Sequence, residues 1–104
     1  MKITYHEKEY ELKYSFRALM IYENITQKSF QPKSLTDIIT FFYSIVLASA
    51  KGDIIDYNEF IDWLDDNVDE LNNFSLWLTE VLDLNSKISP KRKTEKKEKS
   101  NSPN

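Results

Sequence analysis

Four aspartates have the spacing of a possible cation-binding or partner-binding row. Asp62, Asp65, Asp66 and Asp69 lie three and four residues apart, which places them along one side of a helix. They could gather a divalent cation, or they could steer a basic helical partner, because complementary charge accelerates association. A solvated helix face is the simplest interpretation, since no histidine or second carboxylate cluster accompanies the row.

The other reactive residues do not indicate a catalytic site. His6, the single histidine, falls in an expected turn, and the sequence places no serine nucleophile beside it. The chain has no cysteine, which excludes thiolate nucleophiles, thiolate metal sites and disulfides. We therefore predict that the protein is not an enzyme and uses no cofactor or metal.

The segment GDIIDYNEFI resembles the second half of an EF-hand calcium loop. With Gly52 as the loop glycine, three of the oxygen ligands would have to come from Leu47, Ser49 and Lys51. Two of these side chains carry no oxygen, so a helix C-terminal cap at Gly52 explains the segment better.

Aromatic residues are abundant, with 2 Trp, 6 Tyr and 6 Phe among 104 residues. Phe41, Tyr43, Trp63 and Trp77 exceed what one buried stripe on each helix requires, so we predict that they contribute to a surface for a protein partner. Burial in the core is the alternative, because aromatic side chains also dominate protein interiors.

The charges form two blocks of opposite sign, although the formal net charge is only −3. Residues 53–86 contain ten acidic side chains and no Lys or Arg, whereas residues 87–104 contain seven basic side chains and two glutamates. No aliphatic or aromatic residue follows Pro90, so we predict one folded domain over residues 1–86 and a disordered Lys-rich tail over residues 87–104. A solubilising role is favoured over nucleic-acid binding, because the tail lacks aromatics and follows an acidic domain.

The longest apolar run, Ile38 to Ala48, is shorter than the ~20 residues that a membrane-spanning helix needs. The sequence also lacks a basic N-terminus followed by an apolar segment. We therefore expect a cytoplasmic protein that does not bind membranes.

The hydrophobic period changes near residue 15. Alternating apolar residues predict two strands, Lys2 to Tyr5 and Glu9 to Tyr14, joined by a hairpin turn around His6-Glu7-Lys8. Helical spacing begins directly afterwards, with Ser15 as the expected N-cap of a helix that runs to about Asn24.

Three further helices are predicted from capping residues and apolar stripes. They begin at Ser34, at Asp56, and after a break at Asn72 and Asn73. The apolar stripe after Ser34 is so wide that this helix must be central in the domain or covered by a partner. The predicted fold class is mainly α (α+β), with an N-terminal β-hairpin packed on a bundle of about four helices.

The segment ITYHEKEYELKYSFRALMIYENITQKSF resembles the N-terminal signature of the tail assembly chaperones of long-tailed bacteriophages. In that signature a short hairpin enters a helix that carries Phe, Leu, an aromatic residue and Glu, and a Thr-Gly-Lys-Ser-like turn follows. The matching positions here are Phe16, Leu19, Tyr22, Glu23 and Thr26-Gln27-Lys28-Ser29. The chain departs from the signature twice, because its hairpin turn has no glycine and Gln27 replaces the glycine after Thr26.

The resemblance implies a chaperone, from a phage or prophage, that binds the tape measure protein and keeps this long helical chain soluble until the tail tube polymerises. It implies many copies on each tape measure chain, a possible contact with the tail tube protein, action in the host bacterial cytoplasm and absence from the mature virion. Such chaperones also occur in a longer form made by ribosomal frameshifting, for which Lys96-Lys97 is a candidate position. The alternative is a small acidic adaptor or regulator that uses its basic tail on nucleic acid.

Overall fold

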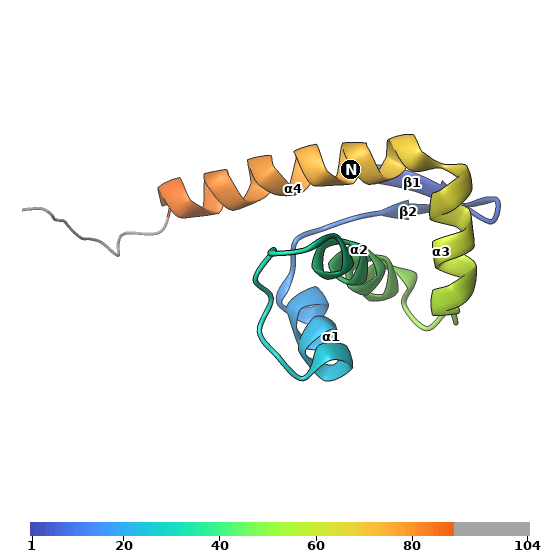
Figure 1. Cartoon of the computed structure of the whole chain (residues 1–104), viewed down its shortest axis with the longest axis horizontal. Coiled ribbons are helices and arrows are strands. Elements are labelled where there is room, and N and C mark those ends of the chain that lie inside the picture. The colour runs from blue at the N-terminus through green and yellow to red at the C-terminus, as the bar shows by residue number, and fades with distance from the viewer. Residues whose placement is uncertain (89–104) are drawn as a thin grey trace, which may run out of the picture.

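The computed structural model describes residues 1–88, and the side chains of residues 1–84. A two-stranded hairpin is followed by four helices (Figure 1). The elements are β1 (Lys2–Tyr5), β2 (Lys8–Glu11), α1 (Phe16–Thr26), α2 (Leu35–Ala50), α3 (Tyr57–Asp66) and α4 (Val68–Ile88). The predicted fold class is therefore confirmed. Lys87 and Ile88, which the predicted tail included, are the last residues of α4, whereas residues 89–104, with the candidate frameshift position at Lys96-Lys97, lie outside the described residues.

The hairpin is tighter and shorter than predicted. The strands pair antiparallel, with Ile3 opposite Tyr10, and a two-residue turn of His6 and Glu7 joins them. Both turn residues have positive φ, as a type I′ turn requires. Strand β2 ends at Glu11, opposite Lys2, rather than at Tyr14, and one further backbone hydrogen bond joins the Leu12 amide to the Met1 carbonyl.

Each of the three expected N-caps forms. The Ser15 hydroxyl accepts a hydrogen bond from the amide of Ala18 at 3.1 Å. In the same way, the Ser34 hydroxyl accepts from Asp37 and the Asp56 carboxylate accepts from Glu59. Such caps satisfy backbone amides that have no partner within the helix, and they fix where each helix begins.

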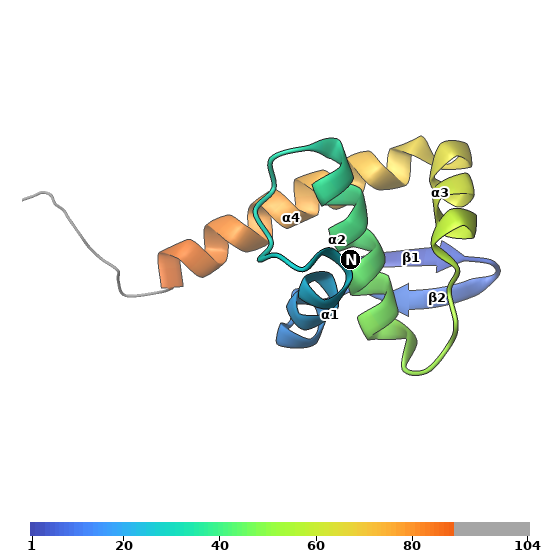
Figure 2. The same ribbon diagram turned by 60° about the horizontal axis from the view of Figure 1, so that its bottom comes forward.

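Helix α2 is the centre of the domain. It lies between α1 on one side and α4 on the other (Figures 1 and 2), and it also contacts the hairpin. Its neighbouring residues Phe41 and Phe42 are both fully buried, and they point into two separate aromatic clusters. The wide apolar stripe on this helix is thus explained by burial between elements of the same chain.

The two clusters hold the layers together. On the α1 side, Phe41 stacks on Phe30 with ring centroids 3.9 Å apart, and Tyr22 contacts both rings. On the α4 side, Phe42 stacks on Phe74 at 4.2 Å and meets Phe60 of α3 edge-on. Offset or edge-to-face aromatic pairs of this kind add to the free energy gained by burial.

The break between the last two helices is at Asn67, not at Asn72 and Asn73 as predicted. The Asn67 amide donates to the Leu64 carbonyl, and its side-chain amide donates to the Trp63 carbonyl at 2.8 Å. These bonds end α3 and allow the chain to turn into α4, which carries Asn72 and Asn73 on its exposed side. Helix α4 then extends past α1 and α2, so the described residues span 53 × 27 × 23 Å (Figure 1).

Helix α2 ends in two consecutive residues with positive φ. Lys51 is left-handed at φ 52°, and Gly52 follows at φ 107°. The glycine therefore lies at the expected helix end, one residue after the capping position itself. No helix in the described part of the chain is both long and apolar enough to cross a lipid bilayer.

Candidate partner-binding surface

Phe41 does not contribute to any surface. Its side chain has no exposed area, and the rings of Tyr14, Tyr22 and Phe30 enclose it. The prediction that Phe41 contacts a partner is wrong for this fold, because the chain between α1 and α2 covers the outward side of α2 with Phe30.

The other three predicted aromatics lie at the edges of the core. Tyr43 on α2, Trp63 on α3 and Trp77 on α4 are each half-buried. Tyr43 donates its hydroxyl proton to the Ile55 carbonyl, which fixes the loop before α3. Trp77 contacts Phe74 with centroids 5.7 Å apart.

Trp63 is the most strongly packed of the three. Its ring lies 5.4 Å from that of Tyr5, 5.6 Å from that of Phe60 and 6.3 Å from that of Phe42. Trp63 therefore joins the hairpin to α2 and α3, and it leaves only part of its ring for a partner.

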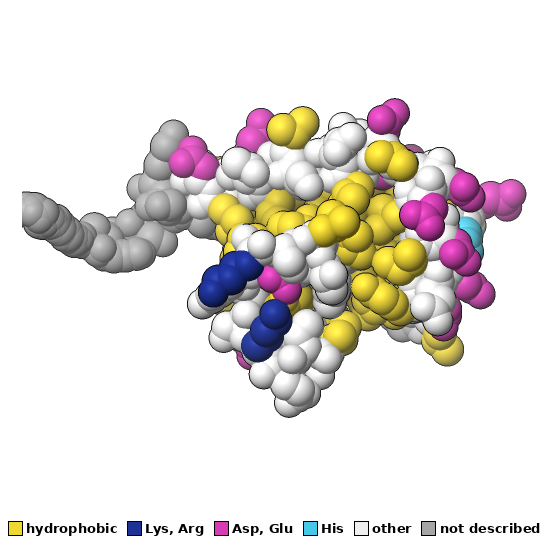
Figure 3. Space-filling view, viewed as in Figure 1, with side chains coloured by type: hydrophobic (Ala, Val, Ile, Leu, Met, Phe, Trp, Pro, Cys, Tyr) yellow, Lys and Arg dark blue, Asp and Glu magenta, His cyan; other side chains and the backbone are white. Residues whose placement is uncertain are grey.

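Hydrophobic side chains collect on one face of the molecule, between α2, α3 and α4 (Figure 3). These are the helices that carry Tyr43, Trp63 and Trp77. The acidic side chains in that view gather mainly over α3 and the adjoining end of the molecule, beside the apolar area. An apolar face beside carboxylates has the chemistry to bind an amphipathic basic helix.

The four predicted aspartates are exposed, but they do not share one helix. Asp62, Asp65 and Asp66 lie on α3, whereas Asp69 lies in the first turn of α4 because the chain turns at Asn67. Each is without an ion-pair partner among the described residues. Carboxylates near a helix N-terminus, as at Asp69, are also favoured by the helix dipole.

No group of three or more His, Cys, Asp or Glu side chains in the described part of the chain is arranged to hold a metal ion. The aspartates of the EF-hand-like segment have structural roles instead. Asp53 pairs with Lys8 and accepts from the Tyr10 hydroxyl, and Asp56 caps α3. The hydrogen bond from Lys8 is the main cause that lowers the pKa of Asp53, and the bonds from Lys8 and Tyr10 tie the loop after α2 to the hairpin.

The turn after α1 is built around the buried carboxylate of Asp37, for which the sequence predicted no role in a site. Asp37 accepts hydrogen bonds from the Tyr22 hydroxyl at 3.3 Å, from the Lys28 ammonium at 3.2 Å and from the Lys33 amide at 3.2 Å. The bond from Lys28 is the main cause that lowers the pKa of Asp37. The only sequence signal for this arrangement is the position of Asp37 three residues after the Ser34 cap.

Gln27 ends α1 in a left-handed conformation, with φ 61° and ψ 29°. Its amide donates to the Glu23 carbonyl at 2.8 Å, and its side-chain amide donates to the Asn24 carbonyl. The Thr26 hydroxyl donates to the Tyr22 carbonyl and accepts from the amide of Lys28. The segment Thr26-Gln27-Lys28-Ser29 is thus a helix C-terminal cap followed by a lysine that pairs with Asp37.

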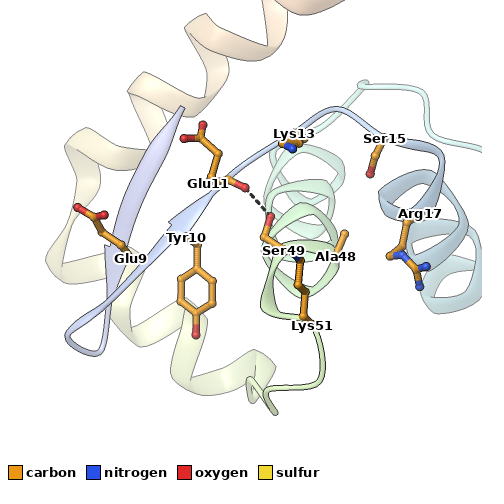
Figure 4. Close-up of a pocket in the computed structure, with 9 residues that line it drawn as sticks. All are labelled: Glu9, Tyr10, Glu11, Lys13, Ser15, Arg17, Ala48, Ser49 and Lys51. Atoms are coloured by element: carbon orange, nitrogen blue, oxygen red, sulfur yellow. Dashed lines mark hydrogen bonds between the residues drawn. The ribbon is translucent and has the colours of Figure 1, made fainter.

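A second surface feature lies between α1 and the end of α2, where sequence analysis predicted no site. It is a hollow lined by residues of β2, of α1, of α2 and of the connection between β2 and α1 (Figure 4).

Comparison of the chain with protein-family models, with curated proteins and with solved structures found no match.

Proposed function

We propose that this protein is a bacteriophage tail assembly chaperone that binds the tape measure protein and keeps it soluble until the tail tube forms. The observation that carries the proposal is the apolar face between α2, α3 and α4, bordered by the acidic side chains of α3 (Figure 3). A long helical chain exposes apolar stripes before its tube assembles around it. A small domain with an apolar face and a charged border can cover such a stripe and remain soluble.

The backbone supports the resemblance on which the proposal also rests. The chain lacks the signature glycines at two places, the hairpin turn and the residue after Thr26. Both places have a left-handed backbone, with φ 67° at Glu7 and φ 61° at Gln27. Glycine is the residue that adopts this conformation at the lowest cost, so the fold retains the geometry that the signature glycines would serve.

Three other signature residues, Tyr22, Thr26 and Lys28, make contacts at the junction of α1 and α2. Tyr22 is fully buried and donates to Asp37, Thr26 caps the helix end, and Lys28 pairs with Asp37. The contacts of Tyr22 and Lys28 with Asp37 join α1 to α2 and hold α2 in place. Helix α2 in turn contributes Tyr43 to the apolar face.

The proposal is tested by co-expression with the tape measure protein encoded in the same phage or prophage genome. We expect the tape measure protein to be soluble, and to co-purify, only when this chain is present. An unrelated small acidic protein of similar charge serves as the control for a general solubilising effect. A tape measure protein that stays insoluble with this chain, or that is equally soluble with the control, would refute the proposal.

A pair of variants on α4 tests the surface. Trp77→Ala should reduce co-purification, whereas Leu76→Ala should not. Leu76 is 68% exposed and is the neighbour of Trp77 in the sequence, so its side chain lies on a different side of α4 from the apolar face. Thermal melts of both variants show whether the loss reflects binding or unfolding. Equal losses of co-purification in the two variants would assign the contact to another face.

A further inference from the structure

We propose that the groove between α1 and the C-terminal end of α2 is a second docking site, which takes an amphipathic helix whose apolar stripe is flanked by carboxylates. This site does not depend on the proposed function. The residues that line the groove do not include Tyr43, Trp63 or Trp77. The rim of the groove is positively charged, whereas the border of the apolar face is acidic.

The groove consists of two adjoining hollows. One has a volume of about 470 Å³ and reaches from the end of β2 to α2 (Figure 4). The other has a volume of about 480 Å³ and lies between α1 and the end of α2. Both are lined by Arg17, Ala48 and Lys51, so they form one continuous depression.

The floor of the groove is apolar. Ile21, Leu47 and Ala48 line the second hollow, and all three side chains are half-buried. This surface can exclude water from a partner's aliphatic side chains without further rearrangement.

An exposed apolar pair lies on α1 beside Arg17 and Ile21, the residues of that helix that line the groove. Phe16 is 86% exposed and Met20 is 63% exposed, and they lie one helical turn apart. Met20 also lies three residues after Arg17, which places it beside the groove wall on the helix surface. Phe16 stands out because the chain buries, wholly or in part, every other aromatic side chain except Tyr57, which is 37% exposed.

The rim is cationic and not neutralised. Lys13, Arg17 and Lys51 line the groove, and the described residues provide no ion-pair partner for any of them. By contrast, Lys8 and Lys28 elsewhere on the chain are paired with Asp53 and Asp37.

The carboxylates near the groove lie at its hairpin end. Glu9 and Glu11 line the first hollow, and Glu11 is bonded to the N-terminal amine at 3.2 Å. No carboxylate lines the second hollow. A partner with acidic residues beside its apolar stripe therefore matches the part of the groove where the floor is most apolar.

The test uses the full chain and two synthetic helical peptides that carry a fluorophore. The peptides have the same leucine stripe, and the flanking positions are all Glu in one and all Gln in the other, because a Lys-flanked peptide would also bind the acidic border of the apolar face. Fluorescence anisotropy should show tighter binding of the Glu-flanked peptide, by about tenfold at low salt. Equal affinity for the two peptides, or tighter binding of the Gln-flanked one, would overturn the proposal.

Matched variants then locate the site. Arg17→Gln should weaken binding of the Glu-flanked peptide about three- to fivefold, whereas Lys33→Gln, which removes the same charge outside the groove, should change it less than about twofold. Met20→Ser should weaken binding about tenfold, and Leu76→Ser on α4 should not. All four side chains are exposed, so circular dichroism should show unchanged folding. Equal effects within either pair would overturn the assignment to this groove.

Two other occupants would also overturn the proposal. If sedimentation shows a dimer that Arg17→Gln dissociates, the groove takes a second copy of the chain. If a random-sequence oligonucleotide displaces the Glu-flanked peptide, the cationic rim binds nucleic acid instead. Failure of tape measure binding would leave the groove assignment unaffected, because the peptide measurements do not involve that protein.

Discussion

The left-handed residue at the end of α1 gives a prediction whose sign can be worked out from the backbone. Gln27 has φ 61° and ψ 29°, a conformation that costs a residue with a Cβ atom about 1–2 kcal/mol. Glycine avoids this cost but loses about 0.5–1 kcal/mol through its greater freedom in the unfolded chain. Gln27→Gly should therefore be more stable than Gln27→Ala by about 1 kcal/mol.

Comparing the two variants with each other removes the contribution of the side-chain hydrogen bond. Gln27 donates to the Asn24 carbonyl at 2.9 Å, and both substitutions delete that bond equally. A difference of about 1 kcal/mol should appear as a difference of about 4–8 °C in Tm for a domain of this size. Thermal and urea melts followed by circular dichroism measure it.

Asn24 provides the matched control within the same helix. It is an exposed residue of α1, and its side chain forms no hydrogen bond among the described residues. In a helical conformation glycine is less stable than alanine by about 0.5–1 kcal/mol, so Asn24→Gly should be less stable than Asn24→Ala. The order of the two substitutions should thus reverse between positions 24 and 27. If alanine is the more stable residue at both positions, the helix continues through Gln27 and the argument from the signature glycine fails.

Three further predictions concern the core and the buried carboxylate. Trp63→Ala should destabilise the fold by about 2–3 kcal/mol in urea melts, because the ring packs on Tyr5, Phe42 and Phe60; a change below about 0.5 kcal/mol would assign Trp63 to the partner surface alone. Tyr5→Phe should leave stability unchanged or raise it by up to about 1 kcal/mol, because the buried Tyr5 hydroxyl has no hydrogen-bond partner among the described residues, and a clear loss of stability would contradict this. The pKa of Asp37 is lowered, chiefly by the hydrogen bond from Lys28, so its contribution to stability is complete above the unfolded-state pKa of about 3.9 and is lost as pH falls from there through the lower folded-state pKa. Asp37→Asn should reduce, without abolishing, the loss of stability between about pH 5 and 2, because Asp53 also has a lowered pKa; an unchanged acid profile would contradict this.

Local chemistry in the sequence determined where most of the elements begin. Ser15, Ser34 and Asp56 mark helix starts because each supplies an oxygen to the amide only three residues later. The alternation of Ile3, Tyr5, Tyr10 and Leu12 placed these four side chains on one buried face for a similar reason, since the period of a strand is a local property.

Only the tertiary structure decided which apolar residues are covered. The helical spacing of Phe16, Leu19 and Met20 suggests one buried face, yet Phe16 and Met20 are exposed because α1 turns Ala18 and Tyr22 toward α2. The sequence predicted that Phe41 lies on a partner surface, but it is buried because Phe30, which lies eleven residues earlier in a loop, packs over it. The basic groove depends in the same way on bringing Lys13, Arg17 and Lys51 together from three segments. Burial and proximity of this kind depend on how helices pack against one another, and the period of a single helix does not contain that information.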